Sequence, residues 1–506
     1  MSERPTAPDA PDEPPSYRWK VLVSVVFGVF MIVLDATVVN IAFRTLQADL
    51  GADVSSSQWV ISVYVLALGI GTPASGWLGD RFGLKRVFLF GLALFTGASI
   101  LCGLAPSLET LVLARALQGL GGSLGAPLAI AMLFAAFPPK QQGLALGIFG
   151  VAVVSAPAIG PLVGGFLVDH GHWRWIFFIN GPIGAVGLLV GLRWLKERRS
   201  GVREPLDWRG LIASTVGFGA VLYGASMAAK RGWGDPEVLA AFAIGVTALA
   251  TFAWLELKVV ERPLLNLRLF KSGTFTNAVL IGWVSVLALF GAEFLMPLYL
   301  QVLRGRAAFD AGLILLPLGL AATVATPLAG RLYDRVGPRP LCLVGFAILC
   351  VNTWQFAKLR LDTPTTEISL LLALRGVALG LTVQTTLATA LASVRKPQLP
   401  RASALVNATR RTVQSISVAI LATILAATLG GLGHGAPPEA PGGGALCEPL
   451  PAAADLAHFC TSYLHGLENA YFVTFVAACV AFLLALFLPG WPRRWSGREG
   501  LQAAPE

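Results

Sequence analysis

The sequence is poor in charge. Only 13% of its 506 residues are Asp, Glu, Lys or Arg, whereas a soluble globular domain carries about 25%. Hydrophobic residues make up 55% of the chain, and the mean hydropathy is +0.70. These values exclude a soluble domain and predict an all-α, polytopic integral membrane protein.

Residues that carry chemistry are also scarce. The six cysteines include no Cys-x-x-Cys pair, and all five histidines lie outside the long apolar runs. No nucleophile motif or phosphate-binding loop appears. Because an embedded enzyme needs clustered catalytic or metal-ligating groups, we expect a protein that is not an enzyme and that binds no metal and no cofactor.

The amino terminus lacks a secretory signal. Residues 1–18 are polar and rich in proline, without the apolar region and cleavage site of a signal peptide. The first apolar run is therefore expected to stay as a membrane anchor. The terminal tails, about 20 and 17 residues long, are too short for a signalling domain, which argues against a non-transporting sensor.

Apolar runs of spanning length recur along the whole chain and predict fourteen transmembrane helices. They lie at 20–43, 58–78, 87–105, 109–134, 143–168, 175–195, 208–229, 238–257, 275–300, 310–330, 340–358, 367–391, 403–429 and 467–489. The termini and even-numbered loops carry 26 Lys and Arg, and the odd-numbered loops carry 8. This asymmetry places both termini in the cytoplasm and explains the net charge of +10 without a nucleic-acid partner.

One carboxylate stands inside the first run. Asp35 has Thr37 and Asn40 close by in the sequence. An acid at this depth costs about 2.5–3.5 kcal/mol on insertion scales, so it is retained where it faces a wet or protein-lined interior. The sequence predicts a proton or cation site at Asp35. The alternative is a carboxylate neutralised by a packing partner.

Three features of the sequence occur twice, and the two copies of each are separated by nearly the same number of residues. GWLGDRFGLKR at Gly76 returns as GRLYDRVGPR at Gly330, Arg115 returns as Arg375, and Asp35 returns as Glu293. The offsets are 254, 260 and 258 residues. The repeat predicts two homologous six-helix bundles with two helices inserted between them, an architecture of transporters. We expect Glu293 and Asp35 to face one central cavity.

The repeat and the loop compositions set the expected domains. They are a cytoplasmic tail at 1–19, an N-terminal bundle at 20–195, a linker with two inserted helices at 196–257, a C-terminal bundle at 258–489 and a tail at 490–506. The outer loop 430–466 contains Cys447 and Cys460 on the oxidising side of the membrane. A disulfide and two free thiols both remain open, and a metal site of His458, Cys460 and His465 fits no zinc template.

Five sequence motifs stand out along the chain. They are LDATVVNIA at 34–42, GWLGDRFGLKR at 76–86, Arg115 with Gln118 and Gly119, GPLVGG at 160–165 and WRWIFFINGPIG at 173–184. With these motifs, the chain resembles the fourteen-helix drug:H⁺ antiporter branch of the major facilitator superfamily over about residues 20–489. The resemblance implies a major facilitator fold and multidrug efflux in the cell membrane, driven by the proton gradient.

The resemblance also implies roles for individual residues. Arg115 takes part in proton transfer, with a structural clamp as the alternative, because a cation inside a span needs a partner. The face of Gly160, Pro161, Gly164 and Gly165 packs closely and seals the interior against proton leak. A conformational latch is expected from the two related loops; its residues are Gly76, Asp80, Arg81, Gly83, Arg86, Asp334 and Arg335.

Two positions depart from the pattern of that branch. Arg44 stands where the first-helix motif ends in Pro, and Val413, Gln414 and Ser417 stand where a glycine-rich face is usual. The neighbouring pair Arg410 and Arg411 has two interpretations. The side chains either extend to the cytoplasmic surface or line the cavity and meet anionic groups of a substrate.

The sequence therefore predicts a proton-coupled exporter that works by alternating access. Its expected substrates are amphipathic small molecules that are cationic or neutral. Asp35 and Arg115 couple the proton, and Glu293 contacts the cation or substrate. Further cavity residues are expected to be Asn40, Trp59, Tyr64, Gln118, Trp283, Tyr299, Gln301, Gln384 and Asn407. The alternatives are a proton-coupled uptake symporter, or a dedicated exporter of a self-made antibiotic, lipid or siderophore. The sequence gives no indication of a periplasmic adaptor.

Overall fold

The computed structural model describes residues 14–52, 54–170, 172–197, 205–260, 263–290, 294–306, 308–429, 447 and 454–490. All regular structure in these ranges is helical. The α-helices are α1 (Pro15–Asp49), α2 (Val54–Ser57), α3 (Trp59–Phe82), α4 (Leu84–Leu104), α5 (Leu108–Ser123), α6 (Gly125–Ala136), α7 (Gln142–His170), α8 (Trp175–Phe178), α9 (Asn180–Trp194), α10 (Trp208–Arg231), α11 (Pro236–Trp254), α12 (Gly273–Phe290), α13 (Met296–Leu298), α14 (Ala308–Val336), α15 (Pro338–Phe356), α16 (Thr365–Ala392), α17 (Leu399–Leu429) and α18 (Ala454–Ala485).

Twelve segments of the described chain are long and apolar enough to cross a membrane. The apolar helix within α12 is shorter, at Gly273–Leu289, and α7 occupies the predicted run at 143–168. Two predicted spans are each built from a helix pair, α5 with α6 and α8 with α9. The count of fourteen spans and the domain boundaries stay predictions.

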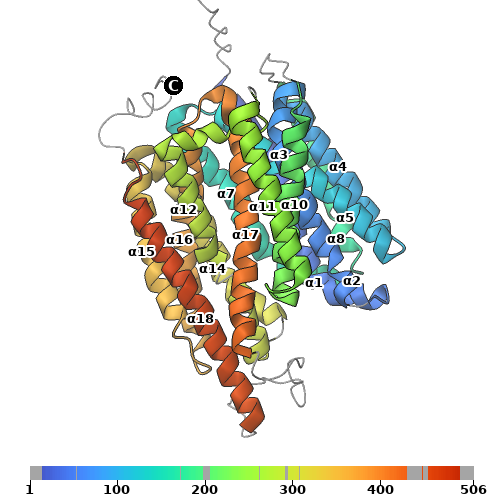
Figure 1. The fold of residues 1–506 in the computed structure, drawn as a ribbon, viewed down its shortest axis with the longest axis vertical. Helices are drawn as coiled ribbons and strands as arrows, with labels where there is room; N and C mark the ends of the chain where they lie inside the picture. The colour runs from blue at the N-terminus through green and yellow to red at the C-terminus, as the bar shows by residue number, and fades with distance from the viewer. Residues whose placement is uncertain are drawn as a thin grey trace, which may run out of the picture.

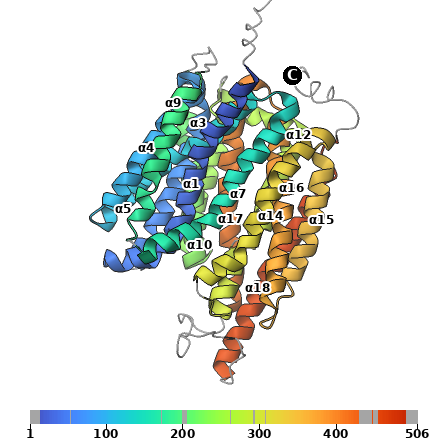
Figure 2. The same ribbon diagram turned by 180° about the vertical axis from the view of Figure 1, so that it is seen from behind.

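The long helices form two groups. Helices α1, α3, α4, α5 and α9 lie on one side, and α12, α14, α15, α16 and α18 lie on the other (Figures 1 and 2). Helix α7 belongs to the first group through α1 and also packs against α14 of the second. Helix α17 belongs to the second group through α12 and α18 and also packs against α3 of the first. The antiparallel pair α10 and α11 covers the outside of this seam, with α10 packed on α3 and α17.

Helix α1 begins and α18 ends at the same end of the molecule, which we call the terminal face (Figure 2). The two groups lie close together at this end and spread apart toward the opposite face. The loops that carry the sequence repeat, α3–α4 and α14–α15, each turn through a glycine with positive φ. The φ angles are 99° at Gly83 and 86° at Gly337, in a region that side chains disfavour.

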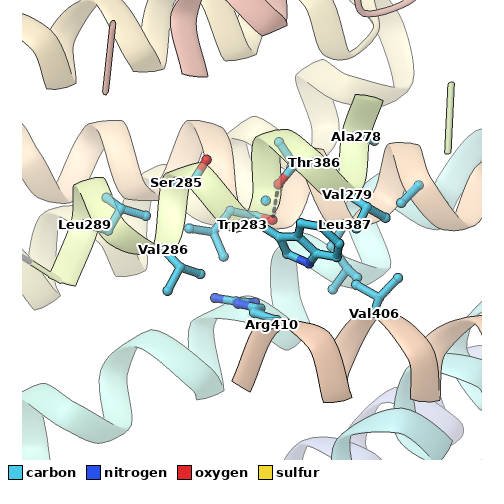
Figure 3. A pocket seen from close by; sticks show the side chains of 13 residues that line it. Ala278, Val279, Trp283, Ser285, Val286, Leu289, Thr386, Leu387, Val406 and Arg410 are labelled. Carbon is cyan, nitrogen blue, oxygen red and sulfur yellow. Dashed lines mark hydrogen bonds between the residues drawn. The ribbon is translucent and has the colours of Figure 1, made fainter. Parts of the chain in front are cut away.

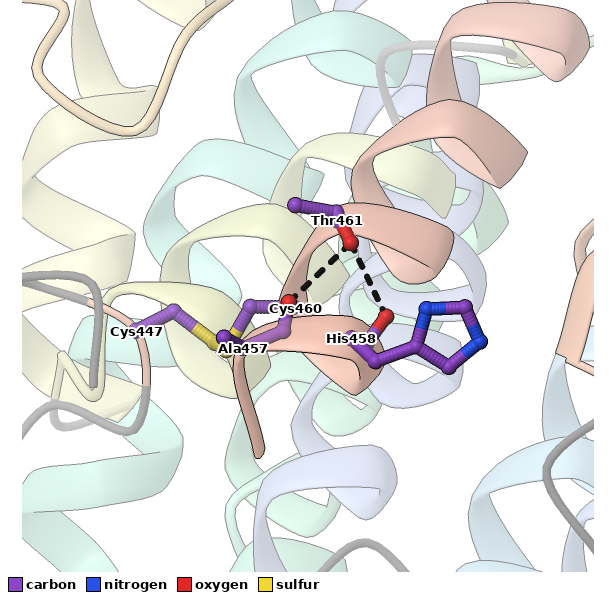
Figure 4. The surroundings of a disulfide bond; sticks show 5 residues. All are labelled: Cys447, Ala457, His458, Cys460 and Thr461. Carbon is purple, nitrogen blue, oxygen red and sulfur yellow. Dashed lines mark hydrogen bonds between the residues drawn. A yellow bond between two sulfur atoms is a disulfide. The ribbon is translucent and has the colours of Figure 1, made fainter. Parts of the chain in front are cut away.

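A disulfide joins Cys447 to Cys460 near the start of α18 (Figure 4). The backbone N–H of Cys447 also donates to the carbonyl of Leu303, at 3.2 Å. The His458 ring points away from the two sulfurs. Since the sulfur of Cys460 is in a disulfide, it offers no thiolate to a metal, and the described part of the chain has no His, Cys, Asp and Glu cluster that could hold a metal ion.

Candidate functional site

The carboxylate of Asp35 is at the centre of a buried polar network. Its Oδ2 accepts from Arg115 Nη1 at 2.6 Å. Its Oδ1 accepts from Gln118 Nε2 at 2.9 Å and from Asn180 Nδ2 at 2.8 Å. Asp35 and Arg115 are each 1% exposed, and Gln118 and Asn180 are fully buried. The ionised carboxylate thus has three donors in a site without solvent access.

Two helices, α5 and α9, supply these three donors. Arg115 and Gln118 stand three residues apart on α5, so both reach the same face. Asn180 is the first residue of α9. Its amide also donates to Ser99 of α4 at 3.0 Å, which fixes the direction of the side chain.

Arg115 has partners besides Asp35. Its Nε donates to the carbonyl of Val60 at 3.1 Å, and its Nη1 donates to Gln118 Oε1 at 2.7 Å. The guanidinium lies 3.9 Å from the ring centre of Tyr64, within the range of a cation–π contact. The guanidinium therefore keeps favourable contacts if the carboxylate loses its charge.

The sequence predicts that Asp35 faces a wet or protein-lined interior, and in this conformation its surroundings are protein-lined. The carboxylate is neutralised by a packing partner, which is the alternative that the sequence left open. The physical reason is the donor set, which compensates the charge inside the first group of helices. Glu293 and the side chain of Asn40 lie outside the described residues, so the proposed pairing of Glu293 with Asp35 stays a prediction.

Arg375 occupies a comparable place in the second group. It is fully buried on α16 and donates to the carbonyl of Leu289 on α12 at 3.2 Å and to Thr353 Oγ1 on α15 at 3.2 Å. Thr353 and Ser99 differ by 254 residues, the offset of the repeated loop text. The repeat thus extends to the surroundings of the two buried arginines.

One of the predicted latch residues, Asp80, bridges the two groups at the terminal face. Asp80, near the end of α3, pairs with Arg401 near the start of α17, with 3.0 Å between Oδ2 and Nε. A methyl group at Gly76 would lie 2.9 Å from the Cα of Arg401. The absence of a side chain at Gly76 therefore lets α3 approach the backbone of α17.

The α14–α15 loop, which repeats the motif of the α3–α4 loop, makes a matching contact from the second group of helices to the first. Asp334 of α14 accepts from the backbone N–H groups of Gly143 and Leu144, at 3.0 and 2.9 Å, where α7 begins. These N–H groups have no partner within the helix, and the helix dipole favours an anion there. A methyl group at Gly330 would lie 2.4 Å from the carbonyl of Gly143. Both contacts hold the terminal face closed.

The remaining latch residues do not bridge the groups. Arg81, Arg86 and Arg335 are exposed, and Arg86 pairs with Glu197 at 3.6 Å. Glu197 also accepts from the N–H groups of Lys85 and Arg86 at 3.2 Å and so covers the start of α4. The prediction that these arginines form the latch is wrong for this conformation, because solvent and Glu197 satisfy their charge.

The glycine face of α7 is only partly packed. A methyl group at Gly160 would lie 2.1 Å from Thr37 Oγ1 on α1, and Gly164 is buried. A methyl group at Gly165 would meet nothing within 4 Å, so close packing at that position is wrong here. The side chain of Pro161 lies outside the described residues.

A small cavity of about 30 Å³ lies between α12, α16 and α17. Trp283 and Val286 of α12, Thr386 of α16 and Arg410 of α17 are among its lining residues. The guanidinium of Arg410 points from α17 toward α12 (Figure 3). Arg410 thus lines a cavity and does not extend to the terminal surface, which decides between the two interpretations of this residue.

Among the predicted cavity residues that the structure describes, Trp283 alone lines this cavity. Its indole donates to Thr409 at 3.1 Å. The others have different surroundings in this conformation. Tyr64 and Gln118 belong to the Asp35 network, Trp59 stacks on Tyr223, Tyr299 donates to the carbonyl of Arg360, Asn407 donates to that of Ser403, Gln384 is buried against Gly150, and Gln301 is exposed.

The sequence analysis missed Asn180 and Arg401. Asn180 lies in the WRWIFFINGPIG text, so a polar residue at a helix start was visible, but nothing in the sequence aimed it at Asp35. Arg401 carries charge in a loop expected to be solvated. Neither position shows a periodicity that would predict its partner.

A buried carboxylate network beside two latched helix groups defines a membrane transporter rather than an enzyme. The family model of the Major Facilitator Superfamily matches residues 25–420. The chain therefore belongs to the major facilitator superfamily.

Several of the relatives by sequence are resistance proteins. The chain is 31% identical to a Multidrug resistance protein B homolog of Mycobacterium tuberculosis (strain ATCC 25618 / H37Rv), over 90% of this chain and 86% of the relative. It is 35% identical to the Tetracenomycin C resistance and export protein of Streptomyces glaucescens, over 72% of this chain and 67% of the relative. These matches confirm the resemblance to the multidrug efflux branch.

The fold matches that of a solved transporter. The proton:xylose symporter XylE aligns with a TM-score of 0.63 at 14% identity, over 94% of this chain and 96% of XylE. At this identity the likeness concerns the fold alone. The fold is that of the major facilitator superfamily, as predicted, and the protein is a multi-pass membrane protein.

Proposed function

We propose that this protein exports amphipathic small molecules from the cytoplasm in exchange for protons. The terminal face lies in the cytoplasm in this proposal, and the protein resides in the cell membrane. Export is supported by the resistance proteins among its relatives. Proton exchange is supported by one observation above all, the ion pair between Asp35 and Arg115.

The surroundings of this pair suit a proton switch. A buried carboxylate without its cation would be strongly destabilised, and Arg115 Nη1 supplies that cation 2.6 Å from Asp35. When a proton binds Asp35, the attraction to Arg115 falls. Arg115 then retains the carbonyl of Val60, Gln118 and the ring of Tyr64, which limits the cost of neutralisation.

Protonation is linked to the conformation through differential stability. Asp35 is held by α5 and α9, and Gly160 of α7 lies against Thr37, two residues from Asp35 on α1. A change at Asp35 thus reaches α7, whose start is held by Asp334 of the other group. We propose that proton binding and substrate binding favour opposite arrangements of the two groups.

The cavity between α12, α16 and α17 suggests the substrate class. Its lining is mostly apolar and includes the Trp283 ring and the Arg410 guanidinium. Apolar walls with few polar groups accept varied amphipathic molecules. We therefore keep the substrates expected from the sequence, which are amphipathic molecules that are cationic or neutral.

Reconstitution in proteoliposomes tests this function. With the same pH gradient imposed, we expect wild-type protein to move tetracenomycin C against its gradient and Asp35→Asn to lose this driven transport while retaining downhill exchange. Full driven transport by Asp35→Asn would contradict the role of Asp35. An uptake symporter would be distinguished by the pH change on substrate addition, since proton and substrate would then move in the same direction.

A further inference from the structure

A second pair of carboxylates lies at the terminal face, away from Asp35. Glu256 is in the π-helical segment Leu255–Val259 that follows α11, and Asp207 caps the start of α10. These are the ends of the two helices inserted between the bundles. The Glu256 side chain is fully buried, although it carries an ionisable group.

One oxygen of each carboxylate is satisfied by backbone N–H groups. Glu256 Oε1 accepts from Leu264 at 2.9 Å and from Leu265 at 3.4 Å. Asp207 Oδ1 accepts from Gly210 at 2.9 Å. The other oxygens, Glu256 Oε2 and Asp207 Oδ2, are buried and have no hydrogen-bond partner.

The two carboxylates approach the same point. A methyl group placed on Gly210 would lie 2.1 Å from Asp207 Oδ2 and 3.1 Å from Glu256 Oε1. Two ionised carboxylates this close repel each other, so one of such a pair binds a proton readily. A buried ionised oxygen without a donor is also costly, whereas a protonated oxygen becomes a donor itself.

We propose that Glu256 and Asp207 share a bound proton in this conformation, and that this proton stabilises the closed latch. The proton sits on Glu256, whose Oε2 has no other partner, and the neighbouring carboxylate of Asp207 stabilises it. This site is separate from the one at Asp35, and the proposal goes beyond the proposed export function.

The contacts around Glu256 connect it to the latch. Arg401 Nη1 donates to the carbonyl of Pro263 at 3.0 Å, directly before the N–H groups that Glu256 holds. Its Nε is paired with Asp80 across the two helix groups. Asp207 and Arg401 are the charged neighbours whose field reaches Glu256, whereas Arg209 and Lys258 on the adjoining segments are exposed.

The direction of the effect follows from charge. While the proton is bound, Glu256 is neutral and Arg401 has Asp80 as its acidic partner on α3. When the proton leaves, Glu256 becomes an anion that competes with Asp80 for Arg401. The latched form binds the proton, so it is favoured at low pH, and raising the pH at the terminal face favours its opening.

Infrared spectroscopy of the purified full-length protein detects the proton directly. During a pH titration, we expect wild type to show a protonated carboxylic acid band that is absent from Glu256→Gln. The matched control is Glu237→Gln, at the other end of α11, which should keep the band. Identical spectra for wild type and Glu256→Gln would overturn the proposal, and so would a band that responds to sodium but not to pH.

Spin-label distances across the latch test the consequence. Arg81→Cys on α3 and Lys396→Cys before α17 carry the labels, with Cys350 and Cys479 replaced by serine. We expect the wild-type distance to lengthen as the pH rises and the Glu256→Gln distance to stay short. Equal pH responses would contradict the link to the latch.

If Glu256→Gln does not fold, a second variant, Asp207→Asn, tests the same proposal. Asp207→Asn removes the neighbouring negative charge, so the acid band of Glu256 should disappear at a lower pH than in wild type. An unchanged titration would overturn the shared proton. None of these readouts uses transport, so a failure here is distinguishable from a failure of the export proposal.

Discussion

The amide of Asn180 donates to Asp35 Oδ1 at 2.8 Å, although the two residues are 145 positions apart. This bond closes the donor set of Asp35 and joins the start of α9 to the middle of α1. The same amide is fixed by Ser99, whose hydroxyl donates to the carbonyl of Phe177 at 2.9 Å. The Asp35 carboxylate is therefore held by four helices, α1, α4, α5 and α9, and not by one motif.

Removal of the Asn180 amide should favour the protonated form of Asp35. Asn180→Ala deletes a hydrogen bond to a charged group, worth about 1.5–3 kcal/mol, and that bond stabilises the ionised carboxylate. We expect the pH profile of driven transport to move to higher pH, by one unit or more at about 1.4 kcal/mol per unit. The matched control is Ser99→Ala, which touches Asn180 but not Asp35. A larger shift in Ser99→Ala than in Asn180→Ala would contradict this role.

The two members of the ion pair should differ in their effect on stability. Arg115→Ala leaves a buried carboxylate without its cation, which costs about 3–5 kcal/mol. Asp35→Asn leaves Arg115 with the Val60 carbonyl, Gln118 and Tyr64, so its loss should be smaller. Thermal unfolding in detergent measures both, and the double variant gives the coupling. Equal losses would indicate that the contacts of Arg115 beyond Asp35 contribute little.

The tight contact of α7 with α14 should control the closed terminal face. Gly330→Ala places a methyl group 2.4 Å from the carbonyl of Gly143, and such overpacking costs about 1–3 kcal/mol. We expect the distance between labels at positions 81 and 396 to lengthen at constant pH. Gly97→Ala on α4, where a methyl group meets nothing within 4 Å, serves as the control and should leave that distance unchanged.

Asp49, at the end of α1 and beyond its membrane span, should give an acid-sensitive contact at the opposite face. The hydrogen bond from the Trp173 indole, at 2.9 Å, and then the charges of His172 and Arg174 lower the pKa of Asp49 below its usual 3.8. A lowered pKa means that the contact stabilises the fold above the usual value and is lost as the pH falls through the folded pKa. We expect Asp49→Asn to lower the melting temperature at neutral pH but not at pH values below that pKa. An equal reduction at both pH values would contradict this assignment.

The sequence predicted the family and the buried charged residues of this protein better than the contacts of those residues. A carboxylate and an arginine inside apolar runs are costly in lipid, so Asp35 and Arg115 could be identified as functional candidates from composition alone. Their mutual contact was not predicted, nor was the contribution of Asn180. The sequence repeat predicted that the α3–α4 and α14–α15 loops are related. A short motif with Gly, Asp and Arg can be recognised however far apart its two copies lie in the sequence.

The sequence could not predict which of the expected cavity residues project from their helices toward the cavity. A helix that is apolar on all sides has no polar stripe that marks its inner face, so Trp59, Trp283 and Tyr299 looked equivalent in the sequence. Their surroundings differ because of neighbours that are distant in the chain, such as Tyr223 for Trp59 and Arg360 for Tyr299. The sequence did not single out Glu256 either, because the burial of its side chain depends on the fold of the segment that follows α11.

Proton release on substrate binding tests the central claim most directly. Purified protein in weakly buffered detergent solution is mixed with tetracenomycin C while a pH indicator is followed. If Asp35 exchanges a proton for substrate, wild type releases protons in a pH-dependent amount, Asp35→Asn releases none while still binding the compound, and Glu237→Gln behaves as wild type. Equal proton release by wild type and Asp35→Asn would contradict the account.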